Sequence, residues 1–410
     1  MQLDAAAGLV HEPAVAAVLA DIDPARIRAY DSTLVGFGTR HTMSDTVSDT
    51  RGIGAARRWI HATLEGFARE CGGCLRVEYD TSTVTVERHP DQPAVHLANV
   101  TAWLEGSDPR RLVVIGAHYD SCICADDRWD ATSDAPGADD DGSGTSAVLE
   151  LARVMSRRYS EGMNATVVFA LYAGEEQGLL GSSALAERLR TEGYTVAAAM
   201  TDDIVGNVSA GDGRTDSTSV RVFAADPDNG GSRELARHAV ALGAVYLPDF
   251  AVFPVWRLDR IGRGGDHIPF ERLGNPAVRF SERLEHYGRQ HLPTDVFDGV
   301  NFGYTANVAR LNAATIAELA LAPPPPDTLR ATRDRASGGQ QFRVQWSAAP
   351  GATGYELLLR RTTSPMWEQV VAVGAATEHL LDAQLDDLWL GVRSIGPDAR
   401  RSAATVWPAR

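Results

Sequence analysis

The sequence contains no lysine, because all 39 basic residues among the 410 are arginine. A chain without a side-chain primary amine cannot form a Schiff base with a substrate or a pyridoxal cofactor, and it cannot supply the lysine of a phosphate-binding loop. Those enzyme classes are therefore excluded. The use of arginine alone also suggests a GC-rich genome, which favours a bacterial source.

The sequence also lacks an excess of positive charge and a long hydrophobic run. Its 54 acidic residues give a formal net charge of −15, whereas nucleic acids and anionic membranes attract basic surfaces. The longest apolar stretch, 166–173, is far too short for a transmembrane helix. We therefore expect no nucleic-acid partner and no membrane span.

Cysteine is scarce too, with two close pairs: Cys71 with Cys74, and Cys122 with Cys124. Neither pair has the second half of a zinc ribbon. A redox CxxC motif would begin a helix after a strand, whereas Cys71 ends a predicted helix. Disulfides and free thiols both remain open, and four cysteines allow three disulfide connectivities.

Strand-like and helical runs alternate through the first three quarters of the chain. Apolar runs at 112–116, 166–173, 196–203 and 276–280 have strand length, and helical patterns separate them. This alternation predicts an α/β fold with a largely parallel sheet and helices on both faces. Ligand sites in such sheets lie beyond the carboxyl ends of the strands.

A proline-rich linker, 322–327, separates this region, 1–321, from a stretch of different composition. In residues 328–410, about seven short alternating runs are divided by turn signals, which predicts a small all-β sandwich. The stretch resembles a fibronectin type III domain. Trp346 stands at the position of its early core tryptophan, although Leu388 stands where a later tyrosine is usual. The sequence does not indicate a partner for this domain.

Five segments of the first region place a potential metal ligand in a turn or at the end of an expected strand. A turn, a helix cap or a solvated face would explain any one of them. Together, along one edge of a sheet, they supply two imidazoles and at least three carboxylates, which suits two zinc ions that share a carboxylate. The segments contain His118 and Asp120, Asp139 to Asp141, Glu175 and Glu176, Asp202 and Asp203, and Asp266 and His267.

In this order the segments resemble the di-zinc aminopeptidase family of aminopeptidase Y and the bacterial leucyl aminopeptidases, from about residue 30 to residue 320. The resemblance implies a three-layer α/β/α sandwich around a mixed, mostly parallel twisted sheet, with two Zn²⁺ per chain. It implies that His118 and Asp203 hold one zinc. Glu176 and His267 would hold the other, and Asp140 would bridge the two.

The resemblance also implies the chemistry. Glu175 falls on the family's general base, which takes a proton from the water between the zinc ions and passes it to the leaving amine. Asp120 matches the carboxylate that orients the first histidine. Tyr287 and His291 resemble residues that line the cleft, where either could hydrogen-bond the oxyanion or serve the structure. The expected substrates are peptides with a free N-terminus.

Three other functions compete with this interpretation. A carboxypeptidase or dipeptidase on the same scaffold would need a cationic patch, for which Arg257, Arg260 and Arg263 are candidates. Glutaminyl cyclases resemble this fold but use a single zinc, so a five-ligand set argues against that acyltransferase activity. Intact ligands likewise argue against an adhesion protein with a degenerate site.

The N-terminus lacks the basic segment of a signal peptide. The family resemblance, the β-domain and the cysteine pairs nevertheless imply an extracytoplasmic location, periplasmic or secreted, with a leader absent from this chain. A cytoplasmic location stays open.

Overall fold

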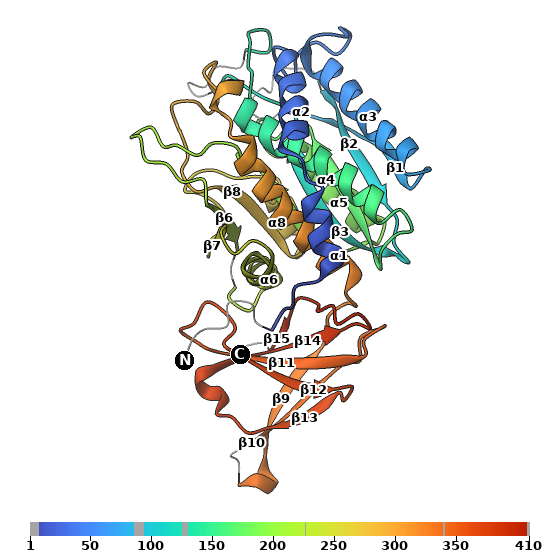
Figure 1. The fold of residues 1–410 in the computed structure, drawn as a ribbon, viewed down its shortest axis with the longest axis vertical. Coiled ribbons are helices and arrows are strands. Elements are labelled where there is room, and N and C mark those ends of the chain that lie inside the picture. Colours follow the sequence, from blue (N-terminus) through green and yellow to red (C-terminus); the bar gives the residue numbers. More distant parts are fainter. Residues whose placement is uncertain (1–7, 86–93, 125–129, 226, 339–340, 408–410) are drawn as a thin grey trace.

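The computed structural model describes residues 8–85, 94–124, 130–225, 227–338 and 341–407. They form an α/β region and a smaller β region that lie end to end (Figure 1). The α/β region contains one eight-stranded sheet in the order β1-β2-β4-β3-β5-β8-β6-β7. Its strands are β1 (Leu75–Val84), β2 (Val95–Leu104), β3 (Asp108–His118), β4 (Ala165–Tyr172), β5 (Thr195–Asp202), β6 (Ser219–Ala224), β7 (Ala251–Val255) and β8 (Ala277–Glu282).

The sheet is mixed, and its centre is parallel. The four neighbouring strands β4, β3, β5 and β8 all run in the same direction. Antiparallel pairing occurs toward the edges, between β1 and β2, β2 and β4, and β6 and β8. Every residue of β4 is buried, as expected of a central strand that is covered on both faces. The carboxyl ends of the four central strands therefore meet at one edge.

Helices cover both faces of the sheet, and the predicted α/β/α sandwich is confirmed. Alternate residues of β3 point to opposite faces, so Val113 and Ile115 belong to one core while Leu112 and Val114 belong to the other. The first core receives α1 (Pro13–Ala20), α2 (Pro24–Gly36), α3 (Gly52–Glu70), α4 (Gly144–Arg158), α6 (Gly231–Tyr246) and α8 (Phe302–Leu321). The second receives α5 (Leu180–Thr191) and α7 (Ile268–Arg272).

The β region consists of two antiparallel sheets around one apolar core that includes Trp346, Tyr355 and Val392. This agrees with the predicted small sandwich, whereas its assignment to the fibronectin type III family stays a prediction. One sheet contains β9 (Leu329–Asp334), β10 (Gln341–Trp346) and β13 (Glu378–Leu381). The other contains β11 (Gly354–Arg361), β12 (Gln369–Gly374), β14 (Leu388–Ile395) and β15 (Thr405–Val406).

The proline-rich linker is fixed against the β region. The Ser394 hydroxyl donates to the carbonyl oxygen of Pro324 at 2.7 Å, and the Thr405 hydroxyl donates to that of Pro326 at 2.5 Å. These bonds use backbone carbonyls that a proline run cannot pair within itself. The linker is therefore a packed part of the structure.

Helix α6 carries the contact between the two regions (Figure 1). The Trp367 indole donates to Glu234 Oε2 at 2.9 Å, and Arg237 donates to the carbonyl oxygen of Pro365 at 2.7 Å. Arg360 of β11 forms an ion pair with Asp228 at 2.9 Å. Buried charges are stable only when they are paired, so these contacts tie the two regions together.

The four cysteines form two short-range disulfides, Cys71–Cys74 and Cys122–Cys124, a pairing that the sequence left open. Within the described ranges, no helix has both the length and the apolar character needed to cross a membrane.

Candidate metal centre

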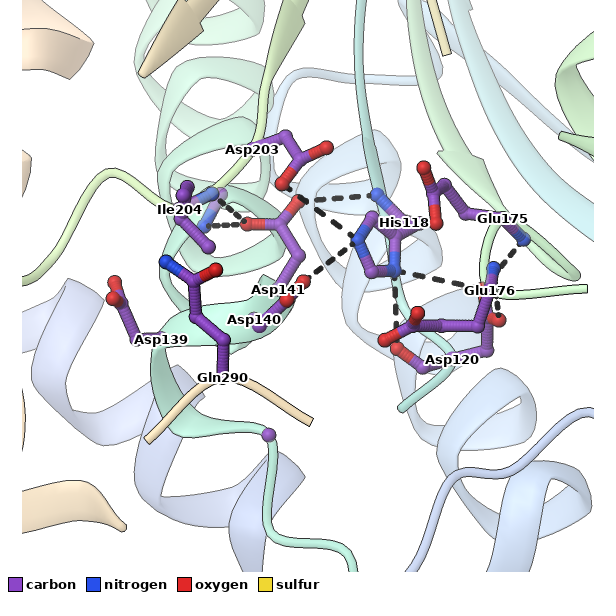
Figure 2. Close-up of polar contacts among 12 residues, drawn as sticks. His118, Asp120, Asp139, Asp140, Asp141, Glu175, Glu176, Asp203, Ile204 and Gln290 are labelled. Atoms are coloured by element: carbon purple, nitrogen blue, oxygen red, sulfur yellow. Dashed lines mark hydrogen bonds and ion pairs between the residues drawn. The ribbon is translucent and has the colours of Figure 1, made fainter. Parts of the chain in front are cut away.

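Polar side chains gather at the edge where the central strands end. His118 is the last residue of β3, Asp203 directly follows β5, and Glu175 and Glu176 lie in the turn after β4. Asp140 comes from the turn that leads into α4. Figure 2 shows the His118 ring at the centre of this edge, with Asp140 and Asp203 on one side and the two glutamates on the other.

The first donor group consists of His118, Asp140 and Asp203, whose ligand atoms all lie within 4.8 Å of one another. His118 Nε2 is 3.2 Å from Asp140 Oδ1 and 4.0 Å from Asp203 Oδ1. All three side chains are buried. The structure therefore brings together the residues that the sequence predicted for the first zinc.

The second donor group contains Glu176 and His291. His291 Nε2 lies 3.2 Å from Glu176 Oε2 and also 3.2 Å from Asp140 Oδ2. The two oxygens of Asp140 thus face two different imidazoles. This is the arrangement expected of a carboxylate that bridges two metal ions. The sulfurs of Cys122 and Cys124 lie in the same group but belong to a disulfide.

These residues fit zinc in their donor chemistry and in their unbalanced charge. Imidazole nitrogens and carboxylate oxygens are zinc ligands, and Glu176 Oε1 is buried without a hydrogen-bond partner among the described residues. The negative charge of Glu176, opposed by burial and assisted by Asp140, raises the pKa of His291 to about 11. The carboxylates that raise this pKa also make the electrostatic potential at the site negative, which favours a cation there, and zinc binding would release the proton.

Asp120, predicted to orient the first histidine, contacts both His118 and the glutamate turn. His118 Nδ1 lies 3.1 Å from the Asp120 carbonyl oxygen and 3.6 Å from its Oδ1. The Asp120 carboxylate also accepts hydrogen bonds from the backbone N–H groups of Glu175 and Glu176, each at 3.2 Å. Burial alone would raise the pKa of Asp120, but His118 first and then these backbone N–H groups hold that pKa below its usual range. The Asp120 carbonyl oxygen thus contacts the histidine, and its carboxylate fixes the glutamate turn and lies close to the same ring.

Two further aspartates support the site, and the sequence analysis assigned neither of them a role. Asp295 accepts hydrogen bonds from the backbone N–H groups of Asp139 and Asp140, at 3.0 and 2.9 Å. Asp141 accepts from the N–H groups of His118 and Gly144, at 3.2 and 2.9 Å. Both fix the turn that presents Asp140. Their positions in the sequence could have indicated this role, because Asp141 directly follows Asp140 and Asp295 lies four residues after His291.

Glu175 faces a cavity of about 450 Å³ that Asp140, Glu176, Asp203 and His291 also line. Burial raises the pKa of Glu175 well above its usual range, and the charges of Asp203 and Glu176 add to this although His118 opposes it. In the part of the chain that the structure describes, no hydrogen bond or ion pair engages the Glu175 carboxylate. It is therefore free to receive a proton from a molecule in the cavity.

His267 is not brought to the donor groups, in contrast to the role predicted for it. Its Nε2 donates to the carbonyl oxygen of Leu258 at 2.7 Å and lies 3.7 Å from Asp259 Oδ2. The loop that contains His267 does border the cavity, since its neighbours Gly264 and Ile268 line it, but the imidazole is engaged by Leu258. His291, in the segment after β8, instead lies next to Glu176 and Asp140.

Tyr287 does not reach the cavity either. Its side chain is 67% exposed and is absent from the lining, so the structure gives it no position from which to bind an oxyanion. His291, the other oxyanion candidate, stands where a metal ligand was expected.

Comparisons with known proteins agree with this geometry. Residues 99–316 match the model of peptidase family M28. A probable zinc metalloprotease of Leptosphaeria maculans is 36% identical over 97% of both chains, and one of Pyricularia oryzae is 36% identical over 95% of this chain and 83% of its own length. These relatives are fungal and weigh weakly against the bacterial source suggested by arginine usage.

Solved structures share the fold. LapB from Legionella pneumophila aligns with a TM-score of 0.62 over 77% of both chains at 24% identity. The LapA aminopeptidase of the same organism aligns with a TM-score of 0.59 over 76% of this chain and 75% of its own at 25% identity. A glutaminyl cyclase of Porphyromonas gingivalis aligns with a TM-score of 0.52 over 72% of this chain and 98% of its own at 21% identity. With its matched family model and its zinc metalloprotease relatives, the chain belongs to peptidase family M28, a family of zinc-dependent peptidases.

Proposed function

We propose that the chain is a two-zinc aminopeptidase. The observation that carries this proposal is Asp140, whose Oδ1 lies 3.2 Å from His118 and whose Oδ2 lies 3.2 Å from His291. In this proposal His118 and Asp203 hold one ion, Glu176 and His291 hold the other, and Asp140 bridges them. His291 thereby takes the role that the sequence had suggested for His267.

Bound zinc supplies Lewis acidity, which lowers the pKa of water and polarises the carbonyl group of the scissile peptide. Glu175 acts as the general base: its carboxylate accepts a proton from the attacking water and later passes it to the leaving amine. Two features support this role. Glu175 lines the same cavity as the donor residues, and the hydrogen bonds that the N–H groups of Glu175 and Glu176 donate to the Asp120 carboxylate fix the turn.

The expected substrate is a peptide with a free N-terminus. A protonated amine is attracted to a cavity wall that contains four carboxylates, those of Asp140, Glu175, Glu176 and Asp203. The cavity is small for a peptidase groove and suits one or two residues rather than a long chain. The similarity to the LapA aminopeptidase points the same way.

Metal analysis combined with hydrolysis of leucine p-nitroanilide and its N-acetylated form tests the proposal. About two zinc ions per chain and hydrolysis of the free amine only would support it. Equal hydrolysis of both substrates would refute the aminopeptidase assignment and leave a zinc peptidase of another specificity. Formation of pyroglutamate from an N-terminal glutamine, without peptide hydrolysis, would favour the cyclase alternative.

We also propose that the protein works in an oxidising, extracytoplasmic compartment. Two disulfides support this location, because reducing cytosols rarely keep such bonds. Alkylation of free thiols in freshly lysed source cells would test this location. We expect the four cysteines not to react, because they are in disulfides, and alkylation of all four would contradict the proposal.

A further inference from the structure

Three arginines line the cavity that contains the candidate metal ligands: Arg260, Arg263 and Arg272. The four carboxylates of the same wall already have roles as metal ligands or as the general base in the function proposed above. The arginines have none, although guanidinium groups are well suited to bind a carboxylate through two parallel hydrogen bonds. We therefore asked which of them could bind a substrate.

Arg260 is neutralised by the protein itself. Its Nε lies 3.1 Å from Asp259 Oδ1 and one of its terminal nitrogens lies 2.9 Å from Glu285 Oε2. Only 8% of its side chain is exposed. With two carboxylates already paired to it, Arg260 is a structural cation.

Arg263 is held in place without being neutralised. It donates to Gln290 Oε1 at 2.9 Å, and another of its nitrogens lies 3.4 Å from His291 Nε2. The carboxylate nearest to it is that of Asp140, at 4.0 Å, which is the proposed bridging ligand. Because 28% of its side chain remains exposed, Arg263 can present further N–H groups to the cavity.

Arg272 has no partner of its own. It is the last residue of α7 and stands four positions after Ile268, on the same face of the helix, and both residues line the cavity. Its side chain is exposed, and among the described residues it makes no hydrogen bond or ion pair. Leu179 lines the same cavity, so this charge stands beside an apolar surface.

We propose that Arg263 and Arg272 bind a carboxylate of the substrate. This inference rests on the proposed function. Neither guanidinium group is neutralised by a carboxylate that belongs to it alone, so the two give the cavity a positive region. A neutral substrate would leave these two charges without an ion-pair partner. The carboxylate is either the side chain of an acidic first residue or the C-terminus of a dipeptide. The enzyme therefore selects acidic N-terminal residues or very short peptides.

Three isosteric dipeptide probes, each with a reduced peptide bond that cannot be cleaved, distinguish these sources in a binding titration with the zinc-loaded full-length protein. Reduced glutaminyl-glycinamide has no carboxylate, reduced glutamyl-glycinamide has only the side-chain carboxylate, and reduced glutaminyl-glycine has only the C-terminal carboxylate. We expect one of the two acids to bind at least about tenfold more tightly than the probe without a carboxylate. The acid that does so identifies the source.

Variants connect the preference to the residues. Arg263→Gln and Arg272→Gln should each reduce the preference, while Arg272→Lys should retain part of it. Arg257→Gln is the matched control, because Arg257 is exposed nearby and does not line the cavity. Equal binding of all three probes to the natural protein, or a preference that survives both glutamine substitutions, would overturn the inference.

Hydrolysis separates this inference from the proposed function. Cleavage of glutamyl and glutaminyl anilides with equal kcat/KM, together with equal binding of the probes, refutes the carboxylate preference and leaves an aminopeptidase. Retained preference in binding with no hydrolysis of any free-amine substrate refutes the aminopeptidase and leaves the carboxylate site.

Discussion

Replacing His291 by alanine should remove one of the two zinc ions. In the structure His291 Nε2 is 3.2 Å from Glu176 and from Asp140, so the substitution leaves the second ion with one carboxylate of its own and a shared one. Loss of a group that merely orients a ligand weakens metal binding by about 10–100-fold. Loss of the ligand itself should weaken zinc binding by more than about 100-fold. This corresponds to a loss of more than about 2.7 kcal/mol in the binding free energy of the second ion.

The matched variant is His267→Ala, since His267 is the histidine that sequence reasoning favoured. It should keep both zinc ions. Its Nε2 donates to the carbonyl oxygen of Leu258. The substitution leaves that carbonyl oxygen without its hydrogen bond, which costs about 1–3 kcal/mol of folding stability. Both variants must therefore be assayed well below their unfolding temperatures.

Zinc per chain, measured by mass spectrometry after dialysis against a zinc buffer, decides between the two histidines. The expected values are about one for His291→Ala and about two for His267→Ala. Chelator competition then gives the affinity of each position. Two tightly held ions in His291→Ala, or one in His267→Ala, would refute the assignment of the second site.

Three further results are expected. Glu175→Gln should keep both metals and lose hydrolysis by at least about 100-fold, because the amide cannot accept the proton, and near-normal turnover would remove Glu175 from the mechanism. Asp120→Asn should weaken zinc binding by about 10–100-fold in chelator competition, since the substitution removes the negative charge 3.6 Å from His118 Nδ1, whereas an unchanged affinity would leave the orientation of His118 to the Asp120 backbone carbonyl. Trp367→Ala should lower the free energy of unfolding by about 3–5 kcal/mol in a denaturant titration, because it removes a buried indole that donates to Glu234, and a loss below about 1 kcal/mol would show that this contact contributes little to stability.

Much of the α/β region follows from local patterns. The central strands are continuous apolar runs, which only a sheet covered on both faces can bury. The edge strand β7 was not predicted, because its five residues include Pro254 and its burial is incomplete.

The candidate site shows where local patterns stop being sufficient. His118, Glu176 and Asp203 directly end or follow parallel strands, so position in the chain already places them at the carboxyl edge. His267 and His291 both lie in loops that border the cavity, and spacing alone does not say which imidazole faces the carboxylates. That choice depends on long-range contacts, because His267 Nε2 donates to the Leu258 carbonyl oxygen whereas His291 Nε2 lies 3.2 Å from Asp140 and Glu176.

The contact between α6 and the β region also limits how this protein can be recombined during evolution. A β-domain that is joined to a catalytic domain only by a flexible linker can be exchanged between genes without changes to the catalytic domain. Here an incoming domain would have to bring an indole to meet Glu234 and a guanidinium to meet Asp228, or lose the hydrogen bond and the ion pair that join the two regions. The two regions should therefore be inherited together, with α6 and the loop around Trp367 changing in step.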